Sequence, residues 1–349
     1  MVNIAQAMRR PLEQRPVPTP PLSEHGPRLS LECSEWLPMS PAEAYQKLIG
    51  YLSEIGAQVE NNKPFSPNRC VCILDQLLDY PKEFINNLHA LTLGLPKNKE
   101  SLARHAVHVT INALMMGRAM GFGRKPLLTL ATAALFHELG MHTIPLAIRE
   151  KREPLTADEL KLIRQHPDIA SSLLLNCGMS WLDPAMIILQ EHERSDGSGY
   201  PRGLKGSAIQ VSASIIGLLD FYESLINSRP HRNRITAAEA TMVLIRQGKN
   251  LFPPAVIKHF LSLYSLYPVN SYIRLNNGVV GVVIRVNPLS PMKPVIKLVA
   301  DAHWRPLTET QSIDLAQISL LYIKEVLSED MVREKTGWDN SAAGQSFMT

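Results

Sequence analysis

The chain has 349 residues, enough to bury a full hydrophobic core, and 45% hydrophobic with 19% charged residues is the composition of a folded protein. Its formal net charge of +4 is small for this length and argues against a nucleic-acid-binding protein. Charged residues or histidines interrupt every apolar segment, so no membrane-spanning helix is expected. Residues 1–10 lack the apolar core of a secretory signal, and we expect a cytoplasmic protein.

The first hundred residues divide into a lead-in and a helical part. Residues 1–39 are rich in proline and show little apolar periodicity, which predicts a disordered lead-in. Ser40-Pro41-Ala42-Glu43 combines a capping box with proline at the first helical position, and this pattern predicts the start of an amphipathic helix. Further helices are expected over residues 69–78 and 81–93. Residues 40–98 therefore form a predicted N-terminal helical subdomain.

Residues 99–267 are predicted to form an all-helical core. Apolar residues recur at helical spacing over residues 102–120. Residues 127–139 are nearly all apolar, which predicts a central helix buried on every side.

Two further helix starts stand in the second half of this core. A capping box at Thr156 predicts a helix that runs into His166. Asp183-Pro184 predicts the start of a helix that carries Glu191 and His192.

The pattern changes after Pro268. Asn276-Asn277-Gly278 is a hairpin signal between two β-branched runs, and a third run follows. These runs, residues 272–275, 279–286 and 295–299, predict a small β module over residues 268–327, and residues 328–349 are expected to be a flexible tail. The predicted fold class is mainly α, with a helical bundle, an N-terminal helical subdomain and a small C-terminal β module.

Metal-capable side chains are concentrated in the helical core, where six of the eleven histidines fall within 88 consecutive residues. Histidine with carboxylates suits Mn, Fe or Zn, and mixed sets of this kind commonly hold two metals that clamp a phosphodiester. The candidate ligands are His105, His137, Glu138, His166, Glu191, His192 and Asp220.

A structural explanation competes with this one, because a single histidine on a helix is more often a hydrogen-bonded or surface group than a ligand. We accept that explanation for His108 and His142. For His137-Glu138 the balance is reversed, since a carboxylate inside an apolar helix is costly to bury without a cation or strong hydrogen bonds.

These motifs together resemble the HD-GYP branch of the HD metal-dependent phosphohydrolases. The resemblance covers residues 81 to about 250 and includes His105, His137-Glu138-Leu139-Gly140, Leu155-Thr156, His166-Pro167, Glu191-His192-Glu193-Arg194, Asp196-Gly197-Ser198-Gly199-Tyr200-Pro201, Gly203-Leu204-Lys205-Gly206, Asp220 and Arg229-Pro230. It implies a bacterial hydrolase of the second messenger cyclic di-GMP, built as an HD-type helical bundle around a two- or three-metal centre.

The sequence departs from the family pattern at four positions. Glu138 replaces the aspartate of the His-Asp pair, and Glu191 replaces the first of two tandem histidines. This shell is richer in oxygen and favours Mn or Fe over Zn. Met141 stands in place of a lysine, whose loss weakens transition-state stabilisation by roughly a few kcal/mol. Ser101 stands where three-metal members carry an acidic ligand, so two divalent metal ions are expected.

The resemblance also implies roles for the site residues. His137 and Glu138 would be catalytic as well as metal-binding. The substrate-binding residues would be Asp196, Gly199, Tyr200, Pro201 and Arg229. The Gly-Tyr-Pro loop is also a candidate docking point for a signalling protein, and a tight surface turn is the plain alternative. A homodimer is left open, and neither nucleic acid nor a membrane span is expected.

Two functions follow. The first is a metal-dependent cyclic di-GMP phosphodiesterase, with activity weakened by the four departures. The second is a catalytically degenerate relative that binds cyclic di-GMP or a protein without turnover. We favour the enzyme, because all seven ligand positions hold residues that can coordinate a metal.

Overall fold

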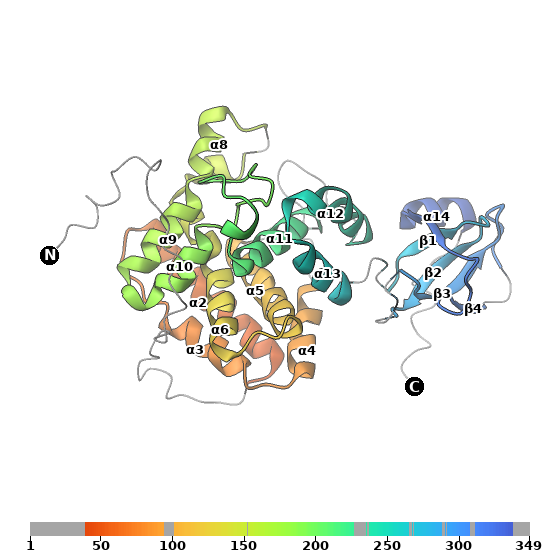
Figure 1. Cartoon of the computed structure of the whole chain (residues 1–349), viewed down its shortest axis with the longest axis horizontal. Coiled ribbons are helices and arrows are strands. Elements are labelled where there is room, and N and C mark those ends of the chain that lie inside the picture. Colours follow the sequence, from red (N-terminus) through yellow and green to blue (C-terminus); the bar gives the residue numbers. More distant parts are fainter. Residues whose placement is uncertain are drawn as a thin grey trace. The chain divides into compact units, whose positions relative to one another are not determined.

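The computed structural model describes residues 39–93, 101–151, 153–226, 235, 237–264, 267, 269–287, 290, 292–307 and 311–337 (Figure 1). The chain falls into two compact units, Met1–Gly217 and Leu218–Thr349. Of the predicted lead-in, residues 1–38 lie outside the described residues, as does Arg229. Within the described ranges, none of the helices combines the length and the apolar character needed to cross a membrane.

The first unit is helical. In chain order its elements are α2 (Pro41–Glu60), α3 (Asn68–Leu77), α4 (Lys82–Leu93), α5 (Leu102–Ala119), α6 (Arg124–Phe136), η3 (His137–Thr143), α7 (Leu146–Arg149), α8 (Ala157–Ile163), α9 (His166–Asn176), η4 (Met179–Trp181), α10 (Leu182–Ile188) and η5 (Gly206–Ala208). Helices α5 and α6 pack side by side at its centre, α2 packs on α5, and α10 packs on both α6 and α9. Every residue of α6 from Leu127 to Phe136 is buried, which confirms the predicted central helix.

The N-terminal subdomain begins as predicted. The backbone N–H of Ser40 donates to Oε2 of Glu43 at 2.7 Å, and the N–H of Glu43 donates to Oγ of Ser40 at 3.3 Å. This reciprocal pair satisfies two of the amides that a helix leaves unpaired at its start. The capping box is confirmed, and α2 continues to Glu60.

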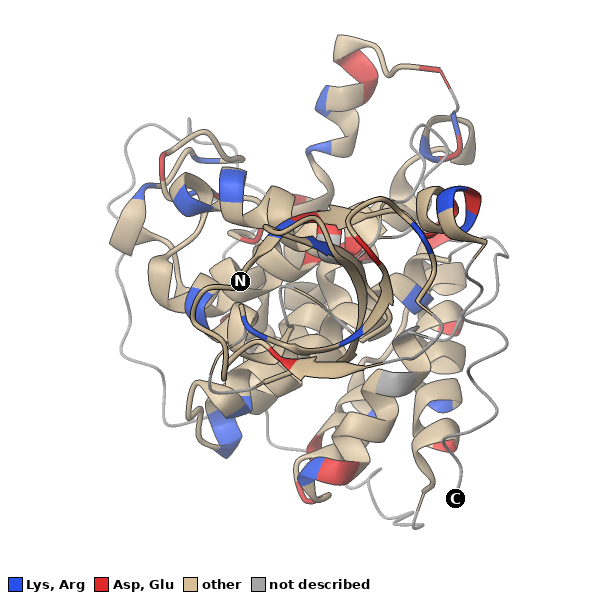
Figure 2. Cartoon of the chain, turned by 90° about the vertical axis from the view of Figure 1, so that its right-hand side faces the viewer, with Lys and Arg blue, Asp and Glu red and all other residues tan. Residues whose placement is uncertain are grey.

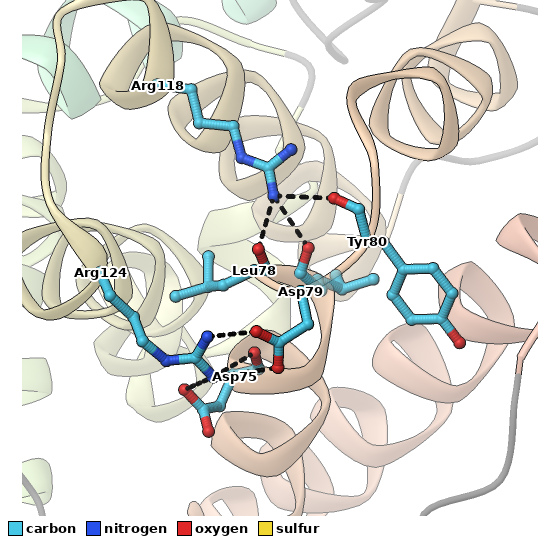
Figure 3. A network of polar contacts seen from close by, with 7 residues as sticks. Asp75, Leu78, Asp79, Tyr80, Arg118 and Arg124 are labelled. Carbon is cyan, nitrogen blue, oxygen red and sulfur yellow. Dashed lines mark hydrogen bonds and ion pairs between the residues drawn. The ribbon is translucent and has the colours of Figure 1, made fainter.

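Two arginines join the N-terminal subdomain to the central helices (Figure 3). Nη2 of Arg118, on α5, donates to the backbone carbonyls of Leu77, Leu78 and Tyr80 at 3.0, 3.1 and 3.3 Å. It thereby satisfies carbonyls that the end of α3 leaves open, where a cation also complements the helix dipole. Arg124, at the start of α6, forms ion pairs with Asp75 and Asp79. The end of α3 is thus tied to both α5 and α6.

The end of α6 differs from the prediction. The helix stops at Phe136, and the chain tightens into the 3-10 helix η3, which carries His137 and Glu138. A close backbone approach accompanies this change, because a Cβ atom on Gly140 would lie only 2.1 Å from the carbonyl oxygen of His166. Glycine is the residue that permits such an approach. The packing of η3 on α9 therefore brings His137 and Glu138 next to His166.

Two other predicted helix boundaries are wrong. The helix that starts with the Thr156 capping box ends at Ile163, and a new helix begins at His166, because Pro167 fits the first turn of a helix better than its interior. Helix α10 ends at Ile188, so Glu191 and His192 lie in the turn after it.

The second unit contains helices and a small sheet. Helix α11 (Val211–Ile226) begins in the first unit and continues into the second, and the later elements are α12 (Ala237–Leu251), α13 (Pro254–Leu263), β1 (Tyr272–Leu275), β2 (Val280–Arg285), β3 (Val295–Ala300), β4 (Ser312–Asp314), β5 (Ile323–Leu327) and α14 (Glu329–Thr336). The five strands pair antiparallel in the order β4-β3-β2-β1-β5. Gly278 turns the β1–β2 hairpin with a φ of +87°, so the predicted hairpin and β module are confirmed.

Part of the predicted flexible tail is ordered. Residues 329–336 form α14, which starts where the Met331 N–H donates to Oγ of Ser328 and ends at Gly337 with a φ of +66°. Val332 is 1% exposed and packs with Leu327 in a hydrophobic cluster of the sheet. One buried apolar residue in a polar stretch was too weak a signal for a sequence pattern.

Acidic and basic residues both occur along the described ribbon (Figure 2). This distribution agrees with the small net charge.

Candidate metal centre

Two groups of metal-capable side chains stand in the structure. Within each group, every residue offers one ligand atom, and these atoms lie within 4.8 Å of one another. The first group is His105, His137, Glu138 and Asp220, and the second is His166, Glu191 and His192. Every ligand predicted from the sequence thus falls into one of the two groups.

Backbone carbonyls orient two of the histidines. Nδ1 of His137 lies 2.7 Å from the carbonyl oxygen of Ala134, and Nδ1 of His166 lies 2.8 Å from that of Ile163. A carbonyl can only accept, so Nδ1 carries a proton in both rings and Nε2 is the nitrogen that can face a cation, the arrangement found in metal-binding histidines. His137 is completely buried, and its Nε2 has no hydrogen-bond partner among the residues that the structure describes. Both rings are therefore prepared to bind a cation through Nε2.

The carboxylates face these imidazoles. In the first group Oε1 of Glu138 lies 3.8 Å from Nε2 of His105. In the second group Glu191 is completely buried, and neither of its oxygens has a hydrogen-bond partner within the described part of the chain. Its Oε1 lies 3.3 Å from Nε2 of His166. A buried carboxylate without hydrogen bonds is costly unless a positive charge compensates it. The donor set around Glu191 fits a divalent cation.

The electrostatic field of the site also favours positive charge. Burial alone would lower the pKa of His166, but the carboxylates of Glu191 and Glu138 outweigh it and raise that pKa to about 9. Nε2 of His166 lies 3.1 Å from Nε2 of His192. Two imidazole nitrogens at this distance can share one proton, or both can turn their lone pairs to one cation.

The glycine-rich segment that follows His192 is held by buried polar contacts. The Glu193 carboxylate, 2% exposed, accepts the backbone N–H groups of Arg202 and Leu204 at 2.7 and 2.8 Å. Nη1 of Arg194 donates to the carbonyls of Glu191 and Glu193 at 3.0 and 2.9 Å. The turn that carries Glu191 and His192 is thus fixed to the segment after it.

The closest approach within this segment is at Gly199. A Cβ atom there would lie 2.4 Å from the carbonyl oxygen of His192, which leaves no space for a side chain. The next residue, Tyr200, donates its N–H to the same carbonyl at 3.2 Å, and the Tyr200-Pro201 peptide bond is cis.

The predicted substrate-binding residues make local contacts in this structure. Asp196 accepts the N–H and the hydroxyl of Ser198 at 2.9 and 2.6 Å, and these bonds lower the pKa of its exposed carboxyl. The ring of Tyr200 stacks on that of His192, with centroids 4.7 Å apart. The substrate-binding role of these residues and of Pro201 stays a prediction.

Three residues outside the ligand set have clear structural partners. His108 is 2% exposed and its Nε2 lies 2.8 Å from the hydroxyl of Tyr45, and His142 pairs with Glu60 at 3.0 Å. The structural interpretation of both histidines is confirmed. Ser101 caps α5, because its Oγ accepts the N–H of Arg104 at 3.2 Å.

Sequence reasoning gave no role to Glu193 or Arg164. Glu193 stands directly before a glycine-rich segment whose backbone amides need acceptors, a signal that was available. The guanidinium carbon of Arg164 lies over the Tyr200 ring, 5.3 Å from its centroid. The two residues are 36 positions apart in the sequence, so a local sequence pattern does not predict their contact.

Comparison with known proteins shows two domain matches and several relatives of similar sequence. A model described as HD domain matches residues 85–256, and one described as KOW domain associated with HD domain matches residues 272–335. A cyclic di-GMP phosphodiesterase of Pseudomonas aeruginosa is 27% identical over 248 residues, 68% of this chain and 60% of the relative. The cyclic di-GMP phosphodiesterase PdeB of Borreliella burgdorferi is 25% identical over 229 residues, 65% of this chain and 60% of the relative.

Residues 85–256, about half of the chain, thus match the HD domain model, which agrees with the resemblance to the HD-GYP branch. A solved HDG"Y"P protein from Bdellovibrio bacteriovorus shares the fold of this chain, with a TM-score of 0.53 and 19% identity over 64% of this chain and 71% of that one. The match confirms the HD-type helical bundle that the sequence predicted. The chain spans about 60% of the length of the two curated relatives named above.

Proposed function

We propose that this chain is a divalent-metal-dependent phosphodiesterase that hydrolyses cyclic di-GMP. One observation carries the proposal. Glu191 is buried, has no hydrogen-bond partner among the described residues, and lies among imidazole nitrogens in a group that could hold a cation. The substrate class rests on the relatives, whose printed names describe them as cyclic di-GMP phosphodiesterases.

In the proposed mechanism each group of side chains holds one cation. His105, His137, Glu138 and Asp220 would bind the first, and His166, Glu191 and His192 the second. Divalent cations supply Lewis acidity and an activated water to phosphodiester hydrolysis. With both cations bound, these residues would hold them in place beside the phosphodiester. Hydrolysis would form a P–O bond from water and break one P–O bond of the cyclic dinucleotide, and a proton of the water would pass to the leaving oxygen.

The ligand set supports Mn or Fe and a count of two. Glu138 and Glu191 each bring a carboxylate, and the resulting mixture of oxygen and imidazole donors suits these metals better than it suits Zn. Ser101 uses its hydroxyl to cap α5 and brings no carboxylate to the site, which supports two cations and not three.

A degenerate, non-hydrolysing binding protein is the second candidate. Met141 favours it, because the family carries a cation at this position that would stabilise charge on the phosphate. Removal of one such group typically costs roughly 3 kcal/mol of transition-state stabilisation. Weak hydrolysis would agree with the first candidate, and metal binding without hydrolysis with the second.

The deciding experiment measures metal content and cyclic di-GMP hydrolysis on the full chain. Purified wild-type protein is loaded with Mn(II) or Fe(II), and the linear product is quantified by chromatography. His137→Ala should lose bound metal and hydrolysis together, whereas His303→Ala, at an exposed histidine of the second unit, should lose neither. Metal-loaded wild-type protein that leaves cyclic di-GMP intact under all conditions would reject the enzyme.

Four further expectations belong to this proposal. Asp196, Gly199, Tyr200, Pro201 and Arg229 are the residues through which substrate would be recognised. The Gly-Tyr-Pro loop could dock a signalling protein. A cytoplasmic location and a homodimer remain predictions, which fractionation and light scattering would test.

A further inference from the structure

The two ligand histidines of the second group are supported in different ways. His166 is oriented by a hydrogen bond from Nδ1 to the backbone carbonyl of Ile163. The ring of His192 is covered by the ring of Tyr200, with a centroid distance of 4.7 Å and an interplanar angle of 18°. The guanidinium carbon of Arg164 lies 5.3 Å from the centroid of the same tyrosine ring.

We propose that Tyr200 and Arg164 are positioning residues of the metal centre, which act by holding the imidazole of His192 in its ligand orientation. The inference rests on the metal centre of the proposed function and adds the residues that fix the orientation of one of its ligands, His192. Arg164 supports the tyrosine ring, and the tyrosine ring supports the imidazole. Neither residue needs to touch the metal or the substrate for this role.

The backbone keeps the tyrosine ring in register with the histidine. The N–H of Tyr200 donates to the carbonyl of His192, and Gly199 packs against the same carbonyl too closely for any side chain. Glu193 closes the loop on its other side through the amides of Arg202 and Leu204. The tyrosine ring thus belongs to the same closed turn as the imidazole that it covers.

The segment that supplies His166 also supplies the support of Tyr200. Ile163 offers the carbonyl that orients His166, and Arg164 is the next residue. Nε2 of His166 and Nε2 of His192 meet at 3.1 Å. One short segment, residues 163–166, therefore acts on both imidazoles that face each other, on one directly and on the other through Tyr200.

The forces between these side chains are strong enough to orient a metal ligand. Two offset-stacked aromatic rings attract each other, and an arginine guanidinium is attracted to the face of an aromatic ring. The arginine contact is the weaker of the two when the arginine is exposed, as Arg164 is. Residues that orient metal ligands typically change metal affinity by about 10- to 100-fold when they are replaced.

The test is a Co(II) titration of the full-length protein, followed by visible absorption and by calorimetry. Tyr200→Leu should weaken one of the Co(II) sites by about tenfold and change the d–d spectrum of that site. Tyr200→Phe keeps the ring and should restore both the affinity and the spectrum. Arg164→Met should weaken the same site by about threefold. Lys161→Met, at an exposed residue of α8, is the matched control and should change nothing.

Several outcomes would overturn the inference. Unchanged Co(II) affinity and spectrum in Tyr200→Leu would do so, and so would a defect in Tyr200→Phe as large as that in Tyr200→Leu. If Tyr200→Leu does not fold, Arg164→Met decides, because an exposed arginine can be replaced without loss of the core. If wild-type protein binds Co(II) but hydrolyses no cyclic di-GMP, the proposed function is rejected. The Co(II) spectra of wild type and variants then still decide whether Tyr200 and Arg164 position His192. Absence of Co(II) binding in the wild type would reject both.

Discussion

The two ligand groups differ in the backbone that carries them: helices and the 3-10 helix η3 in the first, and an irregular turn together with the start of α9 in the second. His105 lies on α5, and His137 and Glu138 lie at the end of α6 and the start of η3, so helical geometry sets where these side chains point. Glu191 and His192 lie in an irregular turn whose conformation depends on Glu193, Arg194 and Tyr200. A ligand on a helix is placed by local structure, whereas a ligand in a turn is placed by contacts from distant residues. Mutations should therefore affect the two groups differently.

The largest expected effect comes from the backbone contact that joins the groups. Gly140→Ala would place a methyl group 2.1 Å from the carbonyl oxygen of His166, and η3 would have to move away from α9. We expect the free energy of unfolding to fall by about 3 kcal/mol, the upper range for overpacking. Chemical denaturation measures the change, and metal binding should weaken in both groups.

Gly50→Ala is the matched control. Gly50 lies inside α2 with no atom within 4 Å of an added Cβ, so alanine should stabilise the protein by up to about 1 kcal/mol. Equal stability of wild type and Gly140→Ala would contradict the proximity of η3 and α9.

The second prediction isolates the turn. Glu193→Gln would place an amide NH₂ against the two backbone N–H groups that the carboxylate accepts, and leave at least one of them without an acceptor. We expect a loss of about 2 kcal/mol in unfolding free energy. Metal titration should show weaker binding at the second group and unchanged binding at the first. Glu153→Gln, at an exposed glutamate, serves as the control, and equal damage to both groups would contradict the comparison.

The third prediction concerns the buried charge of Glu191. Metal binding should raise the melting temperature of the wild type, because a ligand that binds only the folded state stabilises it. In Glu191→Gln a tenfold loss of affinity would reduce this gain by about 1.4 kcal/mol. Without metal the variant should be less stable than wild type, because the Glu191 carboxylate lies 3.3 Å from Nε2 of His166 and its charge helps to hold that imidazole protonated. A full metal-dependent gain in Glu191→Gln would show that Glu191 is no ligand.

The smallest effect is expected where η3 is anchored to α2. Glu60 accepts from His142 and Arg149, and its hydrogen bond to His142 is the main cause that holds the pKa of its carboxyl below 4.5. A depressed folded-state pKa contributes stability above the unfolded-state value, and this contribution is lost as the pH falls through the folded-state value.

Glu60→Gln should therefore lower stability at neutral pH by less than about 1 kcal/mol, since the pair is partly exposed. The difference from wild type should vanish well below pH 4.5. Denaturation curves across this range measure it, and a difference that persists in acid would contradict the assignment.

Local patterns were enough to predict the helical core, the capping boxes and the β1–β2 hairpin. The residues proposed as ligands lie together in two groups, and their role as ligands stays a prediction. Local patterns failed where a distant contact decides the conformation. The break at His137 depends on η3 packing against α9, and α14 depends on Val332 fitting into the sheet cluster. The contact between Arg164 and the Tyr200 ring could not be predicted for the same reason, because the fold of the turn, and not the local sequence, brings the two residues together.

The hydroxyl of Ser101 has a consequence for how this centre could change. Serine and aspartate are about equally good N-cap residues, so an aspartate in place of Ser101 would preserve the start of α5. Near relatives could therefore gain or lose an extra carboxylate here without disturbing the scaffold. The number of cations can thus evolve separately from the stability of the helix that carries His105.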